Sequence, residues 1–312
     1  MSQQCDRPAG THVSMFTIAI ATLALSGGCA STQHGSLGSV IEATPFSDRL
    51  NDTTANQRII VLDLRGADAY DAGHVAGAVR LDSKLWKDES LAAETGLSHE
   101  ALWHNRIGSA GVSGRDPVVV YDDGRMTEAA RAWFIFQHFG VGEVAVLNGG
   151  YPALKPLIDA GRVPVSATPT EATPVAFASS RASSGTIGLV ERQRVLRSID
   201  ERKAQVFDAR TPDEFTGKNL RRNTRGGHLP TAINLPHSEL LDEHGRLKSP
   251  ETLAKILEDA GFKRGQPVIT HCDGGGRASL AALAAERAGY GPVLNYYLSF
   301  GDWAADASCP VE

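Results

Sequence analysis

Residues 268–279 read Val-Ile-Thr-His-Cys-Asp-Gly-Gly-Gly-Arg-Ala-Ser. The apolar start predicts a short strand, and the alanine-rich segment 278–288 predicts a helix. Cys272 between them therefore faces backbone N–H groups and the positive end of a helix. Glycines tolerate φ > 0 and lack a Cβ, so the loop can curl around an anion. Because such surroundings stabilise a thiolate, Cys272 is predicted to be a nucleophile.

The length of this loop bears on its chemistry. Arg277 is the fifth residue after Cys272. Cysteine-dependent phosphatases have one more residue, Cys-x5-Arg, in a cradle wide enough for phosphate, and here the sixth position is Ala278. The shorter loop resembles that of the rhodanese family, sulfurtransferases that carry a persulfide on this cysteine. The loop by itself is also compatible with a buried, inert cysteine that precedes a helix.

The composition is that of an ordinary soluble globular protein. The chain has 312 residues, 21% of them charged, and a formal net charge of −5, which predicts roughly two domains. No basic patch stands out, so we expect no nucleic-acid partner. Four cysteines are too few for a disulfide framework. No spacing of histidines and cysteines indicates zinc, and we expect neither a metal nor a cofactor.

The first residues differ from the rest. Residues 13–25 are almost all apolar, which is too short to span a bilayer but is typical of a signal peptide, predicted over 1–28. The small residues before Cys29 resemble a bacterial lipobox, in which that cysteine is lipidated. We therefore expect an exported protein, periplasmic or anchored as a lipoprotein, with a flexible tether over 29–44. The alternative is a disordered tail on a cytoplasmic enzyme.

The remainder contains an internal repeat. Apolar strand segments alternate with helical ones, which predicts two α/β domains with parallel sheets, 45–161 and 186–312. Between them, 162–185 is rich in Pro, Ser, Thr and Ala and is predicted to be a linker. The repeated pairs are 61–65 with 206–210, 69–70 with 214–215, 73–81 with 227–235, and 118–121 with 268–271.

Several motifs in this order resemble the tandem-domain rhodaneses. They are Asp-x-Arg at 208–210, the Gly-His segment 227–233, the cysteine loop and the aromatic segment 295–303. The resemblance covers about residue 45 to residue 312. It implies two tandem rhodanese-like domains, each a mainly parallel β-sheet flanked by helices. It also implies that only the second domain is catalytic, and Asp122 at the cysteine position of the first fits this division.

Roles follow for individual residues. Cys272 would attack the donor and carry a persulfide. The loop residues Asp273, Gly274, Gly275, Gly276 and Arg277 would bind the substrate, with backbone N–H groups that stabilise thiolate and persulfide. Arg277 would bind the anionic donor or close the loop by a charged hydrogen bond. By resemblance, Asp208 is structural and Arg210 lines the pocket. We expect His74, His228 and His271 to form hydrogen bonds or to pack, rather than to transfer protons.

The second repeat also has a basic insert, with Lys218, Arg221, Arg222 and Arg225. It predicts either a rim that recruits anions or a solvated loop, and the sequence does not select which arginine would face the pocket. Cys309 is either a bystander or a resolving thiol for Cys272.

The donor is predicted to be a small anionic sulfur compound, thiosulfate or 3-mercaptopyruvate, and the acceptor cyanide or a thiol. Asp273 departs from the loop patterns usual for either donor, and its carboxylate would repel a dianion. The alternative is a sulfur carrier or binding module that does not turn over. We expect a monomer whose only membrane contact is a possible N-terminal lipid.

Overall fold

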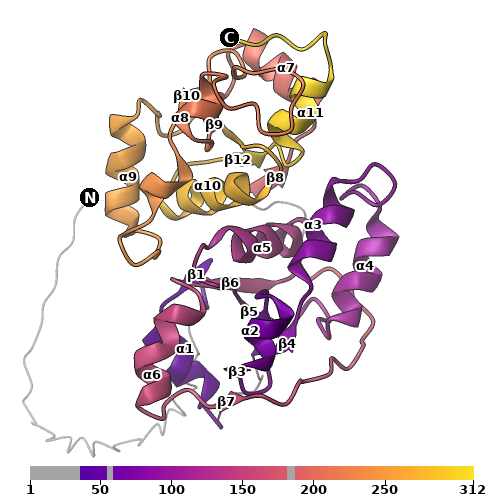
Figure 1. Cartoon of the computed structure of the whole chain (residues 1–312), viewed down its shortest axis with the longest axis vertical. Helices are drawn as coiled ribbons and strands as arrows, with labels where there is room; N and C mark the ends of the chain where they lie inside the picture. The colour runs from indigo at the N-terminus through magenta and orange to yellow at the C-terminus, as the bar shows by residue number, and fades with distance from the viewer. Residues whose placement is uncertain (1–35, 55–58, 181–186) are drawn as a thin grey trace, which may run out of the picture. The chain divides into compact units, whose positions relative to one another are not determined.

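The computed structural model describes residues 36–54, 59–180 and 187–312 (Figure 1). Within them, each half of the chain contains one five-stranded sheet in which all neighbouring strands are parallel. The strand order is β1-β6-β5-β2-β4 in the first half and β10-β9-β11-β12-β8 in the second. The strands of the first sheet are β1 (Val40–Ile41), β2 (Ile60–Asp63), β4 (Val79–Arg80), β5 (Pro117–Tyr121) and β6 (Glu143–Leu147). Those of the second are β8 (Ile187–Leu189), β9 (Gln205–Asp208), β10 (Ile233–Asn234), β11 (Val268–His271) and β12 (Val293–Asn295).

The two sheets repeat one another, as the sequence predicts. β5 and β11 are the central strands of their sheets. β5 lies between β6 and β2, and β11 lies between β9 and β12. All five residues of β5 and all four of β11 are buried, because parallel strands are covered by helices on both faces. The edge strands β1 and β8 are too short, at two and three residues, to give a pattern in the sequence.

Helices cover both sheets, and the predicted α/β class with two repeated domains is confirmed. In β5, Val118 and Val120 join the core that contains α5 and α10, whereas Val119 joins a separate core on the opposite face of the sheet. Helices of the first half are α1 (Ala43–Leu50), α2 (Ala67–Asp71), α3 (Ser83–Leu91), α4 (Glu100–Ser109), α5 (Thr127–Phe139), η1 (Tyr151–Leu154) and α6 (Lys155–Asp159). Those of the second are α7 (Arg192–Asp200), α8 (Pro212–Phe215), η2 (His237–Leu240), α9 (Pro250–Asp259), α10 (Gly276–Arg287) and α11 (Ser299–Ala305).

The described part of the predicted linker, up to residue 180, lies along the N-terminal half. β7 (Val165–Ser166) pairs antiparallel with β3 (His74–Val75). Further on, the Val175 N–H donates to the Gly108 carbonyl at 3.0 Å. A Cβ on Gly108 would lie 2.3 Å from the Val175 carbonyl oxygen, so this close approach requires glycine.

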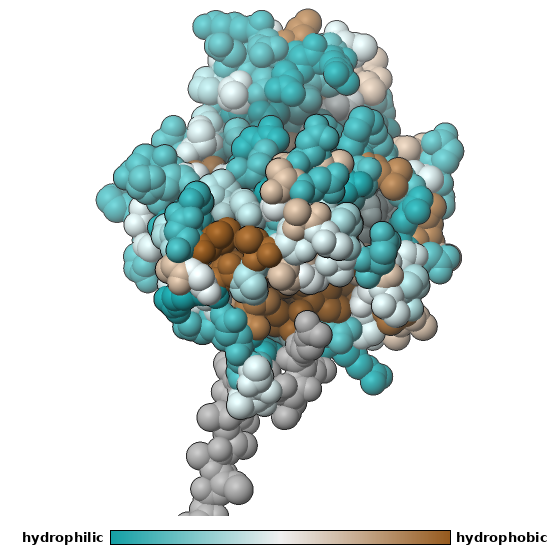
Figure 2. Space-filling view, turned by 60° about the horizontal axis from the view of Figure 1, so that its bottom comes forward, coloured by the Kyte–Doolittle hydropathy of each residue, from teal (hydrophilic) through white to brown (hydrophobic). Residues whose placement is uncertain are grey.

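Few large apolar side chains are exposed among the described residues. Figure 2 shows one face, which is mainly hydrophilic and has hydrophobic residues gathered in its lower part. No helix in the described ranges has the length and apolar character needed to cross a bilayer. The predicted signal peptide and Cys29 lie outside the described residues.

Candidate active site

Cys272 directly follows the central strand β11 and lies just before α10. Its N–H donates to Ser299 Oγ at 3.0 Å, and the same hydroxyl lies 3.8 Å from the Cys272 sulfur. Cys272 is only 1% exposed. The residue is therefore almost completely covered by the surrounding protein. Ser299 is the first residue of α11, which follows β12, and its contact with the thiol was not predicted.

The loop presents backbone donors as expected. Among the described residues, the N–H groups of Gly274, Gly275, Arg277 and Ala278 donate to no protein acceptor. These groups surround the end of β11 and open α10, where the first N–H groups of a helix have no partner within it. Gly275 has φ 87°, a conformation that favours glycine. The arrangement can stabilise a negative charge on the cysteine.

The corresponding loop of the N-terminal half holds its own anion. Asp122 follows β5 as Cys272 follows β11, and its carboxylate is buried. It accepts hydrogen bonds from the N–H groups of Gly124 (2.9 Å), Met126 (3.1 Å), Glu128 (3.2 Å) and Ala129 (3.1 Å). The same fold position in this chain thus surrounds a negative group with amide hydrogens. In the second half, the side chain at this position is a thiol.

Arg277 does not project freely into the site. It donates from both Nη atoms to Glu214, at 2.6 and 2.8 Å, and the Glu214 side chain is 1% exposed. Glu214 also accepts from the Thr211 N–H and hydroxyl in a capping box that begins α8. Burial raises the pKa of Glu214, but the hydrogen bond and charge of Arg277 outweigh this and lower it to about 2. Of the two roles expected for Arg277, these contacts match closure of the loop.

Arg210, which is expected to line the pocket, is engaged within the fold. Its Nε lies 3.0 Å from both carboxylate oxygens of Asp208, and Nη2 donates to the Gly227 carbonyl at 2.9 Å. The guanidinium stacks on Phe300, 3.9 Å from the ring centroid, and the residue is 1% exposed. The pair ties the end of β9 to the Gly227 loop, as expected for Asp208. Arg65 makes the same bonds to Asp63 in the half without a cysteine.

The basic insert contacts the cysteine loop through an uncharged residue. Asn223 donates to Asp273 Oδ1 at 2.7 Å and so fixes the carboxylate of the residue that follows Cys272 in the chain. Arg225 binds carbonyl groups of α11 and of the segment after it, including those of Ala304 and Cys309. Arg221 lies 3.8 Å from Glu214, and its side chain is exposed. Arg225 thus has a structural role, and Arg221 is the arginine of the insert that lies beside the Arg277–Glu214 pair.

Among the histidines that the structure describes, none makes a hydrogen bond to the Cys272 sulfur. His74 and His228 bond the carbonyls of Tyr70 (2.9 Å) and Phe215 (3.1 Å) through Nδ1, as expected. His271 is fully buried, and burial lowers its pKa to about 4, so it packs as a neutral side chain. His237 on η2 was not singled out from the sequence. Burial and the charge of Arg277 lower its pKa, which places a neutral imidazole near that guanidinium.

The second cysteine of the body of the protein is buried elsewhere. Cys309 belongs to the core formed with Tyr296 and Trp303, whereas Cys272 belongs to the core that contains α5 and α10. Both are free thiols. These positions favour the bystander role for Cys309. In the part of the chain that the structure describes, no cluster of His, Cys, Asp or Glu could hold a metal.

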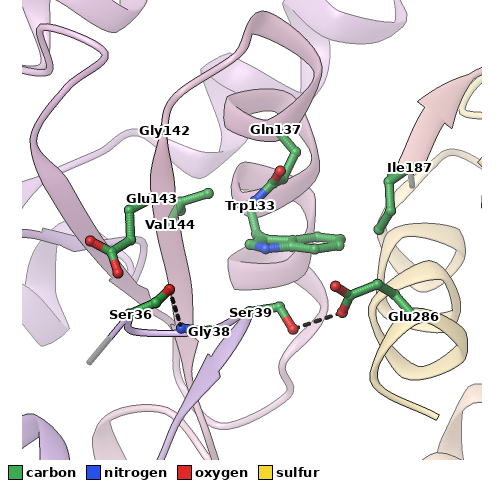
Figure 3. A pocket seen from close by; sticks show the side chains of 10 residues that line it. All are labelled: Ser36, Gly38, Ser39, Trp133, Gln137, Gly142, Glu143, Val144, Ile187 and Glu286. Atoms are coloured by element: carbon green, nitrogen blue, oxygen red, sulfur yellow. Dashed lines mark hydrogen bonds between the residues drawn. The ribbon is translucent and has the colours of Figure 1, made fainter. Parts of the chain in front are cut away.

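Cavities of the described residues are lined by side chains outside the cysteine loop. Figure 3 shows one of about 210 Å³, in which the Trp133 indole lies among residues that include Gln137, Glu143 and Glu286. The lining of this cavity does not include the thiol loop. A second, of about 250 Å³, is lined by residues that include Leu91 and Tyr297. It borders the loop, because a Cβ on Gly274 would lie 3.4 Å from Leu91 Cδ1.

Comparison with known proteins gives consistent matches. The model of the rhodanese-like domain matches residues 43–156 and 191–306. The thiosulfate sulfurtransferase of Gallus gallus is 32% identical over 74% of this chain and 78% of its own length, and that of Cricetulus griseus 32% over 75% and 78%. Among solved structures, the EanB variant Y353A in complex with ergothioneine superimposes with a TM-score of 0.75, covering 88% of this chain and 69% of that one. At 20% identity, this last match concerns the fold alone.

Proposed function

The chain belongs to the rhodanese-like family, and from this membership we propose that it is a sulfurtransferase in which Cys272 carries sulfane sulfur as a persulfide. The observation that carries the proposal is the set of backbone N–H groups without protein acceptors around Cys272. In the other half, the same position surrounds the Asp122 carboxylate with N–H donors. A thiolate and a persulfide are both anions, and such donors stabilise both.

The proposed reaction has two steps. The Cys272 thiolate bonds to the outer sulfur of thiosulfate, the bond to the central sulfur breaks, and sulfite leaves with the electron pair. With 3-mercaptopyruvate, the carbon–sulfur bond breaks instead, and the carbon takes the electron pair and the thiol proton to give pyruvate. Cyanide or an acceptor thiolate then bonds to the outer sulfur of the persulfide. Thiocyanate or the acceptor persulfide leaves, and the Cys272 thiolate is restored.

The charge of the cysteine loop bears on which sulfur donor is preferred. The relatives are named for thiosulfate, a dianion. Asp273 follows Cys272 directly in the loop and its carboxylate is fixed by Asn223, and a negative charge in this loop opposes the approach of a dianion more than that of a monoanion. We therefore propose that both thiosulfate and 3-mercaptopyruvate are used, and that Asp273 lowers kcat/KM for thiosulfate.

A sulfur carrier is the second candidate. The observation that favours it is the low exposure of Cys272, which slows the access of small donors and acceptors. Turnover distinguishes the two functions. With excess thiosulfate and cyanide, a sulfurtransferase releases many equivalents of thiocyanate per chain, whereas a carrier releases one.

Intact-mass measurement tests the covalent step directly. After incubation with either donor, we expect a gain of one sulfur atom that cyanide removes. Cys272→Ser should abolish the gain, and Cys309→Ser should retain it, since Cys309 lies in the other core. A chain that gains no sulfur from either donor, or that gains it on Cys309, would refute the proposal. The same spectrum reports whether Cys29 carries lipid.

A further inference from the structure

A side chain of the N-terminal half reaches the cysteine loop of the C-terminal half. The helices α5 and α10 pack against each other, and residues of both belong to one core (Figure 1). All residues of α10 from Ala278 to Ala285 are buried, and most are alanines, whose small side chains let neighbouring elements approach closely. Because α10 begins with the cysteine loop, α5 lies beside that loop.

Arg131 on α5 makes the contact. Its Nη2 donates to the Gly274 carbonyl at 3.0 Å, and its Nη1 donates to the Tyr297 hydroxyl at 2.7 Å. Nε donates to Glu128 at 3.0 Å, one turn earlier on α5. Arg131 is 4% exposed. All three kinds of donor on the guanidinium are thus satisfied, and two of them bind the C-terminal half.

Tyr297 is fixed from the same side. Its hydroxyl also lies 2.7 Å from Ser90 Oγ at the end of α3, and its ring stacks on Phe134 with a centroid distance of 5.6 Å. Three side chains of the N-terminal half therefore hold this one side chain of the C-terminal half. A rigid Tyr297 in turn limits where the Arg131 guanidinium can lie.

The glycines of the loop leave the space that Arg131 and Tyr297 occupy. A Cβ on Gly275 would lie 2.8 Å from Tyr297 Cε2, and one on Gly276 would lie 2.8 Å from Arg131 Nη2. Side chains at these positions would push the guanidinium away. The consecutive glycines thus admit a cation from the other half, besides letting the loop curl.

The bond to Gly274 has a consequence for the thiol. In a trans peptide, the carbonyl and the next N–H point in opposite directions. Arg131 Nη2 donates to the Gly274 carbonyl from the N-terminal half, and the Gly276 N–H donates to the same oxygen at 3.2 Å. The Gly275 N–H therefore points away from the N-terminal half. This N–H is one of the donors without a protein acceptor.

We propose that Arg131 is a positioning residue of the active site, which orients the Gly274–Gly275 peptide so that its N–H stabilises the Cys272 thiolate and persulfide. The half without a cysteine thereby completes the site. The kinetic test of this inference rests on the proposed sulfur transfer. The effect of Arg131 on the thiolate can be measured without sulfur transfer. Burial lowers the pKa of Arg131, whereas the neighbouring Tyr297, Glu128 and Cys272 raise it overall, so the guanidinium stays charged.

The test uses the full chain with Arg131→Met and Arg131→Lys. We expect Arg131→Met to lower kcat for sulfur transfer at least about tenfold, since loss of an oriented donor to an anion costs 10²–10³ and here the donor is only misdirected. KM for thiosulfate should change less than about threefold, because Arg131 does not touch the donor. Lysine can reach one of the two acceptors and should restore part of kcat. Arg125→Met is the matched control, since Arg125 is exposed and its ion pair is with Asp123 in the same half.

A second readout does not depend on sulfur transfer. The rate of Cys272 alkylation by iodoacetamide should rise with pH along a curve displaced to higher pH in Arg131→Met and unchanged in Arg125→Met. Arg131→Met also removes a positive charge that acts on Cys272, and Arg131→Lys, which keeps this charge, should show a smaller displacement. The other charged and titratable groups around the loop stay the same in these variants, namely Asp273, Arg277, Glu214, His237, His271, Tyr297 and Glu128.

Each possible result either supports or overturns the role of Arg131. An unchanged alkylation curve in folded Arg131→Met, or a fall in kcat that equals the loss of folded protein in urea unfolding, would overturn the proposal. If Arg131→Met does not fold, Tyr297→Phe keeps Arg131 and removes one of its acceptors, and a smaller displacement in the same direction supports the proposal, whereas none overturns it. If the wild type transfers no sulfur, the proposed function fails, and the alkylation curves still decide the role of Arg131.

Discussion

The pair of Arg277 and Glu214 links the stability of the fold to the charge beside the thiol, and Glu214→Gln tests both. The carboxylate is 1% exposed and receives two charged hydrogen bonds of 2.6 and 2.8 Å from Arg277. Removing one partner of a buried pair costs about 3–5 kcal/mol. Arg277 is partly accessible to water, so we expect a loss near the lower limit, about 3 kcal/mol in the free energy of unfolding.

The pH dependence of this loss has a defined sign. The pKa of Glu214 is lowered to about 2 in the folded chain from an ordinary value of 4.5. A lowered carboxylate pKa stabilises the fold above pH 4.5, and this contribution disappears as the pH falls toward 2. The difference between wild type and Glu214→Gln should therefore be constant above about pH 5 and shrink below it.

The variant should act oppositely on the thiol. Without Glu214, the charge of Arg277 is no longer neutralised, and a negative charge on Cys272 becomes more favourable. We expect the pH curve of Cys272 alkylation to move to lower pH, by on the order of one unit. A variant that is less stable thus has a more reactive thiol.

Urea unfolding at several pH values, together with alkylation kinetics, measures both effects. Glu243→Gln is the control, because that side chain is 83% exposed, and it should change stability by less than about 0.5 kcal/mol. A loss below about 0.5 kcal/mol for Glu214→Gln would refute the reasoning on stability. A displacement of its alkylation curve to higher pH would refute the reasoning on charge.

Three further predictions concern the loops of both halves. Asp122→Ala should lower the free energy of unfolding, measured in urea, by about 3 kcal/mol, because four N–H groups lose their acceptor. Asp123→Ala, at the exposed neighbouring position, should lower it by less than about 0.5 kcal/mol. Equal losses in the two variants would contradict this account. The pKa of His271 is about 4 in the folded chain, against 6.5 for an ordinary histidine, so the free energy of unfolding should fall by roughly 3 kcal/mol as the pH drops from 6.5 to 4. His271→Gln should reduce this dependence of stability on pH. If the dependence is unchanged in the variant, His271 is not its cause. Asp273→Asn should raise kcat/KM for thiosulfate about tenfold and for the monoanion 3-mercaptopyruvate less, and equal changes for the two donors would show that charge repulsion does not select between them.

Arg210 shows a signal in the sequence that could have been used. The Asp-x-Arg pattern occurs in both halves, at 63–65 and 208–210. A residue needed for substrate should be repeated only where the thiol is retained. Its presence in the half with Asp122 therefore already indicates the structural pairing that the fold displays.

The sequence by itself determined the architecture and the position of the thiol, because these follow from local order along the chain. Buried β-branched runs predict parallel strands, their recurrence predicts two domains, and a cysteine between a strand and a glycine-rich helix start predicts an anion-holding loop. Only the tertiary structure decided which side chains surround that loop. Ser299 is 27 residues from Cys272, Asn223 is 50 from Asp273, and Arg131 is 143 from Gly274. Such contacts depend on how the sheets and helices pack, and no spacing along the chain encodes them.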